Sequence, residues 1–295
     1  MTGSPARVWR DAGGRNRGVV AVLAFVAALA TLYAVSYPLA EWTTAAEIHL
    51  VPTGPAELGY LVLAGIGLAL AVIGREDLTA FDWLVAIGLA VPVWLAIQAP
   101  YWQFGWTPFI PFYDPTLHAT ETALMTLGGI VLARRSGVVR VLVAERRYRA
   151  TLAAALLGGV IGLVLAAVNV LLFVVSGDVP SASDVPDGML RALKPAILEE
   201  VAFRLLFLAL IIAILRRYLS PGRSAVIAIV LSAVFHAAIH VPDLIVSNPV
   251  AAIGTTAVLS VVFGIPLAVL AYRRGIESAM ACHWTIDAIR FGIGF

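Results

Sequence analysis

Long apolar segments recur along this 295-residue chain and restrict its fold more than any other feature. Hydrophobic residues make up 61% of the sequence and charged residues only 13%, with a mean hydropathy of +0.93. This composition is typical of an integral membrane protein, and its main partner is expected to be the lipid bilayer. The small net charge of +2 does not suggest nucleic-acid binding. A single cysteine, Cys282, excludes an intramolecular disulfide and a cysteine-rich zinc site.

We predict that about nine of these segments form transmembrane helices. All except the fourth, which carries Glu121, are about long enough to cross the hydrocarbon layer. The segments are continuously apolar rather than alternating, which favours helices over a barrel. The predicted fold class is therefore all-α, a polytopic integral membrane protein with eight or nine spans. The segments cover residues 18–39, 57–74, 80–98, 119–133, 150–176, 189–215, 223–246, 249–272 and 276–294.

The distribution of arginine predicts how the chain is oriented and divided. Arginines precede the first segment and recur in every second connection, whereas the alternate connections contain almost no Arg or Lys. By the positive-inside rule we expect a cytoplasmic N-terminus in a bacterial cell membrane and, with nine spans, an external C-terminus. We predict three regions on this basis: a basic N-terminus over 1–17, a four-helix membrane region over 18–149 and a C-terminal helical core over 150–295.

Two adjacent glutamates, Glu199 and Glu200, interrupt the sixth apolar segment, with Arg204 following in the same helix. Ionisable groups at membrane depth are costly and usually line a site or a water-filled cavity. Glu200 and Arg204 are four residues apart, so we expect them to pair on one helix face. Glu199 is rotated by about 100° and is free to face a cavity as a general base. The alternative is that both glutamates only neutralise arginines and hold helices together.

The next segment carries His236 and His240, also four residues apart and expected on one face of a helix. Two histidines at this spacing can bind a divalent metal, although no Glu follows the first as in the zinc-protease helix. One of them can instead share a proton or a water with Glu199. The alternative is a purely structural role, in which they bond a neighbouring helix.

The last segment places His283 and Asp287 four residues apart. An aspartate so placed can orient the imidazole, accept its proton or ligate a metal. Pairing of Asp287 with Arg290 is the structural alternative. Three of the last four segments thus each carry ionisable side chains on one expected helix face.

These three elements, in this order, resemble the CPBP family of CAAX proteases and bacteriocin-processing (Abi) proteins. The family pattern is Glu-Glu-x-x-x-Arg, then Phe-x-x-x-His, then His-x-x-x-Asn or Asp. Residues 199–204 match the first element and residues 283–287 the third. In the second element His240 is at the expected distance, but His236 stands where the family has Phe. The resemblance covers residues 189–294, and the N-terminal half contains no recognised motif.

The resemblance implies an intramembrane endopeptidase with a CPBP-type helical core. By analogy, Glu199 and His240 would activate a water for attack on the scissile carbonyl. His283 and Asp287 would stabilise the oxyanion, while Glu200 and Arg204 would support the architecture of the site. The expected substrate is a membrane protein or peptide, which need not be prenylated.

The resemblance leaves the cofactor open, because the family has been described both as metalloproteases and as metal-independent glutamate proteases. A divalent metal such as zinc would be held by Glu199, His240 and His283, with His236 as a weaker fourth candidate. Two other functions compete with proteolysis. One is a non-catalytic membrane scaffold or immunity factor that retains the polar cluster. The other is a proton-coupled transporter, because Glu, His and Asp on facing helices also build proton relays.

Overall fold

The described part of the chain consists of helices and their connections. A computed structural model describes residues 20, 23, 27, 55–102, 113–181 and 184–295. Within these ranges the structure is 84% helical and contains no strand, which confirms the all-α class. The predicted first span over 18–39 lies outside the described residues except for three positions.

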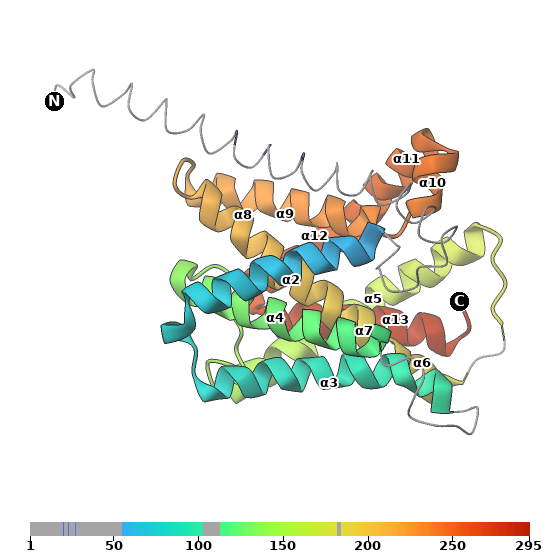
Figure 1. Ribbon diagram of the computed structural model, residues 1–295. Coiled ribbons are helices and arrows are strands. Elements are labelled where there is room, and N and C mark those ends of the chain that lie inside the picture. Colours follow the sequence, from blue (N-terminus) through green and yellow to red (C-terminus); the bar gives the residue numbers. More distant parts are fainter. Residues whose placement is uncertain (1–19, 21–22, 24–26, 28–54, 103–112, 182–183) are drawn as a thin grey trace, which may run out of the picture.

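The remaining helices follow the other eight predicted segments in chain order (Figure 1). Their bounds are α2 Pro55–Ile73, η1 Arg75–Asp77, α3 Ala80–Trp102, α4 Tyr113–Ser136, α5 Tyr148–Val175, α6 Val185–Arg191, α7 Leu193–Glu199, η2 Glu200–Phe207, α8 Leu208–Leu215, α9 Pro221–Ala238, α10 Pro242–Ser247, α11 Pro249–Leu259, η3 Ser260–Gly264, α12 Ile265–Arg274 and α13 Ile276–Gly292. The short elements η2 and η3 are π-helical. The fourth segment is longer than predicted, since α4 has 24 residues.

Four helical stretches of the described chain are long and apolar enough to cross a membrane. They are Ala80–Gln98, Tyr148–Val175, Pro221–Ala238 and Pro249–Arg274. The apolar stretch Glu57–Ile73 is shorter. These helices identify an integral membrane protein, while the count of eight or nine spans and the orientation of the termini stay predictions.

Helix α5 shows an outward distribution of large apolar side chains. Leu156 and Val160 are more than 60% exposed, whereas Gly158 and Gly162 face α13. A Cβ at Gly162 would lie 2.7 Å from the Cys282 carbonyl oxygen, so only glycine permits this approach. Small residues at helix contacts and large apolar residues on the outside are typical of helix packing in lipid.

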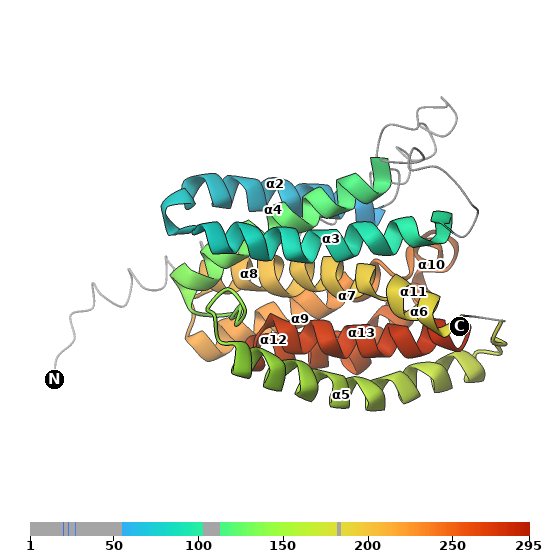
Figure 2. The ribbon, with the colours of Figure 1, turned by 90° about the horizontal axis from the view of Figure 1, so that it is seen from below.

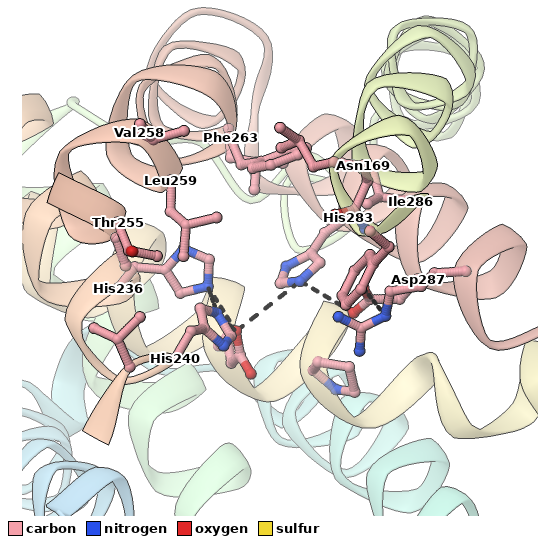
Figure 3. A pocket seen from close by; sticks show the side chains of 18 of the residues that line it. Asn169, His236, His240, Thr255, Val258, Leu259, Phe263, His283, Ile286 and Asp287 are labelled. Atoms are coloured by element: carbon pink, nitrogen blue, oxygen red, sulfur yellow. Dashed lines mark hydrogen bonds and ion pairs between the residues drawn. The ribbon is translucent and has the colours of Figure 1, made fainter. Parts of the chain in front are cut away.

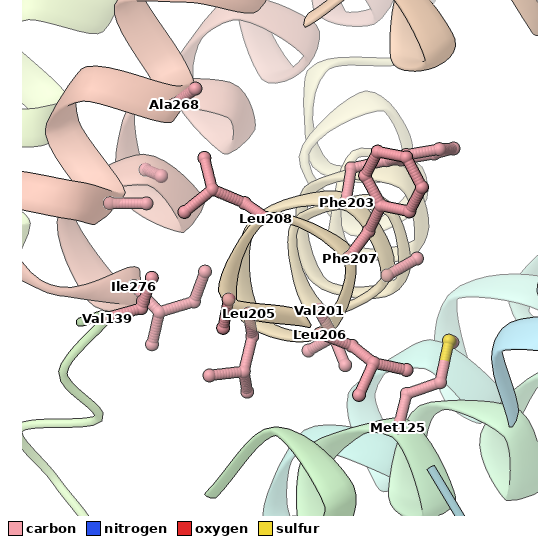
Figure 4. Close-up of a cluster of buried hydrophobic side chains, with 14 of the residues drawn as sticks. Met125, Val139, Val201, Phe203, Leu205, Leu206, Phe207, Leu208, Ala268 and Ile276 are labelled. Atoms are coloured by element: carbon pink, nitrogen blue, oxygen red, sulfur yellow. The ribbon is translucent and has the colours of Figure 1, made fainter. Parts of the chain in front are cut away.

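The helix formed by α7, η2 and α8 runs through the middle of the bundle. Figure 2 shows α2, α3 and α4 on one side of it and α13, then α5, on the other. Its side chains from Leu205 to Ala209 are completely or almost completely buried (Figure 4). A helix that is apolar all round is stable only when it is enclosed. The charged residues at its start are therefore held inside the protein rather than in lipid.

The predicted helix over 223–246 ends early, and this corrects the expected placement of His240. Helix α9 ends at Ala238, and His240 lies in a turn where its backbone N–H bonds the Ala237 carbonyl. Pro242 explains the break, because proline cannot donate to the preceding turn and disfavours helical geometry before it. His240 therefore lies beyond the end of the helix, but its ring still lies beside that of His236, as predicted, with the ring centroids 5.0 Å apart and the two Nε2 atoms 3.4 Å apart.

Candidate functional site

The two glutamates stand where the central helix changes geometry. Glu199 ends α7 and Glu200 begins the π-helical η2, which widens the turn at this point. Single π turns inside α-helices are frequent at functional sites. Glu200 and Arg204 are completely buried, and Glu199 retains 9% of its exposure. Glu200 is thus enclosed by protein, while the neighbouring Glu199 keeps a small exposed surface.

Glu200 contacts two positively charged or hydrogen-bonding partners. Its Oε2 atom lies 3.5 Å from Arg204 Nε, so the expected proximity on one helix face is present. Its Oε1 atom accepts a 2.9 Å hydrogen bond from His283 Nδ1. This second contact joins α13 to the central helix, and no spacing within one segment predicts it.

Glu199 lies among three histidines (Figure 3). Its Oε2 atom is 2.6 Å from His236 Nε2, 3.6 Å from His240 Nε2 and 4.0 Å from His283 Nε2. The nearest partner is therefore His236, which sequence analysis treated as a weaker candidate. The side chain of His240 is 42% exposed and lies further out.

His236 connects Glu199 to the buried arginine. Its Nδ1 atom lies 2.9 Å from Arg204 Nη2, on the opposite side of the ring from Glu199. The ring also packs 5.3 Å from the Phe203 ring and 5.5 Å from the His283 ring, measured between centroids. His236 thus has a hydrogen-bonding partner at each ring nitrogen and packs against two further rings.

His283 and Asp287 are brought together as their spacing predicts. His283 Nε2 lies 3.3 Å from Asp287 Oδ2. The alternative pairing is also present, because Arg290 Nε lies 3.9 Å from Asp287 Oδ1. Both ring nitrogens of His283 thus face carboxylate oxygens, Nδ1 that of Glu200 and Nε2 that of Asp287, an arrangement in which a protonated ring can donate from both nitrogens.

A cavity of about 1100 Å³ opens beside these groups. The cavity is lined by five of the candidate residues, namely Glu199, His236, His240, His283 and Asp287. Other lining residues received no role from the sequence: Asn169 on α5, Lys194 on α7, and Leu244, Gly254, Thr255, Val258 and Leu259 on α10 and α11. A lone Asn inside the apolar run of α5 was the one available signal.

The metal hypothesis can be tested against the donor atoms. Two groups place their ligand atoms within 4.8 Å of one another: Glu199 with His236 and His240, and Glu200 with His236 and His283. The predicted trio of Glu199, His240 and His283 does not form such a group among the described residues. Both observed groups need His236, whose Nδ1 atom is already engaged by the guanidinium of Arg204. Donor atoms are thus close enough to one another to hold a metal ion, and whether His236 can serve as a ligand depends on its tautomer.

Comparison with protein families supports the pattern seen in the site. Residues 181–289 match the family described as type II CAAX prenyl endopeptidase Rce1-like. The resemblance to the CAAX proteases is confirmed. The matched region contains every candidate residue from Glu199 to Asp287. This is a family of peptidases, and the apolar helices of the chain are those of an integral membrane protein. Comparisons with curated proteins and with solved structures gave no match.

Proposed function

We propose that this chain is an intramembrane endopeptidase that hydrolyses a peptide bond of a membrane-associated protein or peptide. The observation that carries the proposal is the position of the Glu199 carboxylate. It lines the cavity, and its Oε2 atom lies between 2.6 and 4.0 Å from nitrogen atoms of three histidines. A carboxylate held this way can accept a proton from water in reach of a substrate.

The proposed reaction needs only groups of this chain and one water. Glu199 takes a proton from the water, whose oxygen attacks the scissile carbonyl carbon. The carbonyl electrons move to oxygen and form an oxyanion. When they return, the C–N bond breaks and the proton held by Glu199 passes to the leaving amine. His240, on the exposed side of Glu199, is placed to hold the water.

Stabilisation of the oxyanion is assigned to His283. Its ring lines the cavity together with Asp287, and in its protonated form it would offer a positive charge there. Fixed charges in an enclosed site stabilise developing charge better than water does, because they need no reorganisation. Asp287 Oδ2 lies 3.3 Å from His283 Nε2, so we assign it the orientation of His283 rather than direct donation to the oxyanion.

The lining of the cavity favours an apolar substrate. Side chains of α10 and α11 on one side and of α5 on the other are mostly aliphatic or aromatic, and Lys194 and Arg290 also contribute to the lining. Apolar lining with few polar groups is typical of ligand pockets. We infer that a membrane-embedded peptide segment or lipid-modified chain enters here.

The test is cleavage by purified protein in liposomes. Three probes are offered: a farnesylated peptide with a C-terminal C-a-a-X sequence, the same peptide without the prenyl group, and a single-span transmembrane peptide. Mass spectrometry identifies the products. Glu199→Gln should lower the rate by about 100-fold or more, while Glu76→Gln, an exposed control on η1, should not.

Unchanged cleavage by a folded Glu199→Gln protein would remove the assigned role. Binding of a probe without turnover by the wild type would favour the scaffold function instead.

A further inference from the structure

His236 offers an inference that rests on the proposed function and adds a residue to it. Both ring nitrogens of this buried histidine are engaged, Nδ1 by Arg204 at 2.9 Å and Nε2 by Glu199 at 2.6 Å. An arginine side chain can only donate hydrogen bonds. The Nδ1 atom must therefore be the acceptor and carries no proton.

This arrangement determines the tautomer of the ring. A neutral imidazole has one N–H, and with Nδ1 bare it is on Nε2. His236 Nε2 therefore donates to Glu199 Oε2. We propose that His236 is a positioning residue, which uses the Arg204 hydrogen bond to present a fixed N–H to Glu199 and so holds this carboxylate toward the cavity.

The same tautomer leaves neither nitrogen of His236 free for a metal. A histidine ligand binds through a bare nitrogen, and its other nitrogen normally carries a proton that is donated to a neighbour. Here that neighbour is the guanidinium of Arg204, which cannot accept.

Three substitutions test whether His236 acts as a hydrogen-bond donor to Glu199 or only fills space. In His236→Gln the side-chain amide reaches the place of Nε2 and can still donate to Glu199. In His236→Asn the shorter amide reaches only the place of Nδ1. In His236→Phe the ring remains without a donor. We expect Phe and Asn to lower kcat at least about tenfold with KM unchanged, and Gln to restore most of the loss.

The readouts distinguish this proposal from the proposed function itself. Wild-type kcat retained by a folded His236→Phe protein, while Glu199→Gln is inactive, overturns the positioning role alone. Equal activity of Gln, Asn and Phe variants overturns it as well. Zinc titration gives a second readout: His236→Gln should leave any zinc binding of the wild type unchanged, and its loss would overturn the exclusion of His236 as a ligand.

An independent observation concerns the other end of the bundle. A cavity of about 510 Å³ is lined by Arg140, Arg216, Arg273 and Arg274, with Tyr272, Gly137 and Val138 completing it. These residues belong to α12 or follow the ends of α4 and α8. Four arginines in one cavity create a strongly positive site.

The four arginines of this cavity outnumber the two carboxylates, Glu145 and Glu277, that act on Arg140. Arg140 pairs with the exposed Glu145, and Arg216 Nη1 donates to the Ser136 carbonyl at 2.8 Å. Arg216 Nε is buried without a hydrogen-bond partner, and no ion pair is recorded for Arg273 or Arg274 among the described residues. The carboxyl end of a helix attracts cations such as arginine. Arginine N–H groups that have no acceptor in the protein nevertheless favour the binding of an anion.

The location of the cavity points to a lipid. The apolar stretch Pro249–Arg274 ends at Arg274, so the arginines lie where a membrane-spanning surface meets water. Basic pockets at such boundaries bind phosphate-bearing head groups. We infer that this arginine pocket binds the head group of an anionic phospholipid.

Native mass spectrometry in neutral detergent tests this inference. With phosphatidylglycerol, the double variant Arg273→Gln, Arg274→Gln should lose at least about tenfold in bound lipid relative to wild type. The matched control is Arg217→Gln, Arg223→Gln, which removes two exposed arginines outside the pocket. Equal loss in both proteins, equal binding of phosphatidylcholine, or full displacement by millimolar inorganic phosphate would overturn a specific lipid site.

Discussion

Glu200 and His283 are 83 residues apart in the chain and meet through a 2.9 Å hydrogen bond from His283 Nδ1 to Glu200 Oε1. This bond joins the central helix to α13, and the same carboxylate lies 3.5 Å from Arg204. One buried group therefore balances the arginine and fixes the ring that borders the cavity. Glu200 therefore has a structural role, whereas its neighbour Glu199 faces the cavity.

The first prediction follows from the burial of Glu200. Glu200→Ala should lower the free energy of unfolding by about 3–5 kcal/mol, because it leaves Arg204 buried without its carboxylate. The measurement is denaturant unfolding in mixed micelles. The control is Glu145→Ala, which removes an exposed partner of Arg140 and should cost less than about 1 kcal/mol. Similar losses for the two variants would contradict the assignment.

Local geometry explains which parts of the site were predictable. The pairing of Glu200 with Arg204 depends only on the spacing along one helix, and the sequence contains that information. The contacts from Glu200 to His283 and from Glu199 to His236 depend on how separate helices pack and rotate. No spacing within one segment determines those rotations, so His240 was preferred over His236 by the family pattern alone.

The helical segments were predictable for the same kind of reason. A continuous apolar run must form a helix in lipid, so the order of segments from 57–74 onward agrees with the structure. Breaks inside a run were harder to see, although Pro242 was a visible signal for the end of α9. The cavity could not be predicted, since it lies between α5, α11 and α13 and depends on their spacing.

A second prediction concerns Asp287. An Asn oxygen can still accept from His283 Nε2, and its amide adds a donor to the cavity. Asp287→Asn should therefore keep the cleavage rate within about tenfold of the wild type, whereas Asp287→Leu, which removes the acceptor, should lower it about 100-fold. Single-turnover cleavage of the probe peptide measures both. A fully inactive Asn variant with wild-type stability would show that the negative charge itself is needed.

A third prediction uses adjacent glycines of α5. A Cβ at Gly158 would overlap the Ser278 carbonyl of α13, whereas one at Gly159 would meet only Thr285 Oγ1 at 3.7 Å. Gly158→Ala should lower the free energy of unfolding by about 1–3 kcal/mol through forced separation of the helices. Gly159→Ala should be neutral or gain up to about 1 kcal/mol from helix propensity. Thermal unfolding of the two proteins decides, and equal melting temperatures would contradict the close contact between α5 and α13.

The last prediction tests whether substrate occupies the large cavity. Gly254 on α11 lines it, and a Cβ there would meet no atom within 4 Å. The backbone therefore has room for a Cβ at this position, and we expect the side chain of Gly254→Leu to take space from the substrate. We expect KM for the farnesylated peptide to rise at least about tenfold, since a few methylene groups in an apolar pocket discriminate to this extent.

The control for this prediction is Gly88→Leu on α3, where a Cβ also meets no atom within 4 Å but the residue lies outside the cavity lining. It should leave both KM and kcat unchanged. A raised KM in both variants would indicate a general effect on the membrane-embedded protein. If Gly254→Leu instead left KM unchanged while folding normally, the substrate would have to approach Glu199 by a path that avoids α11.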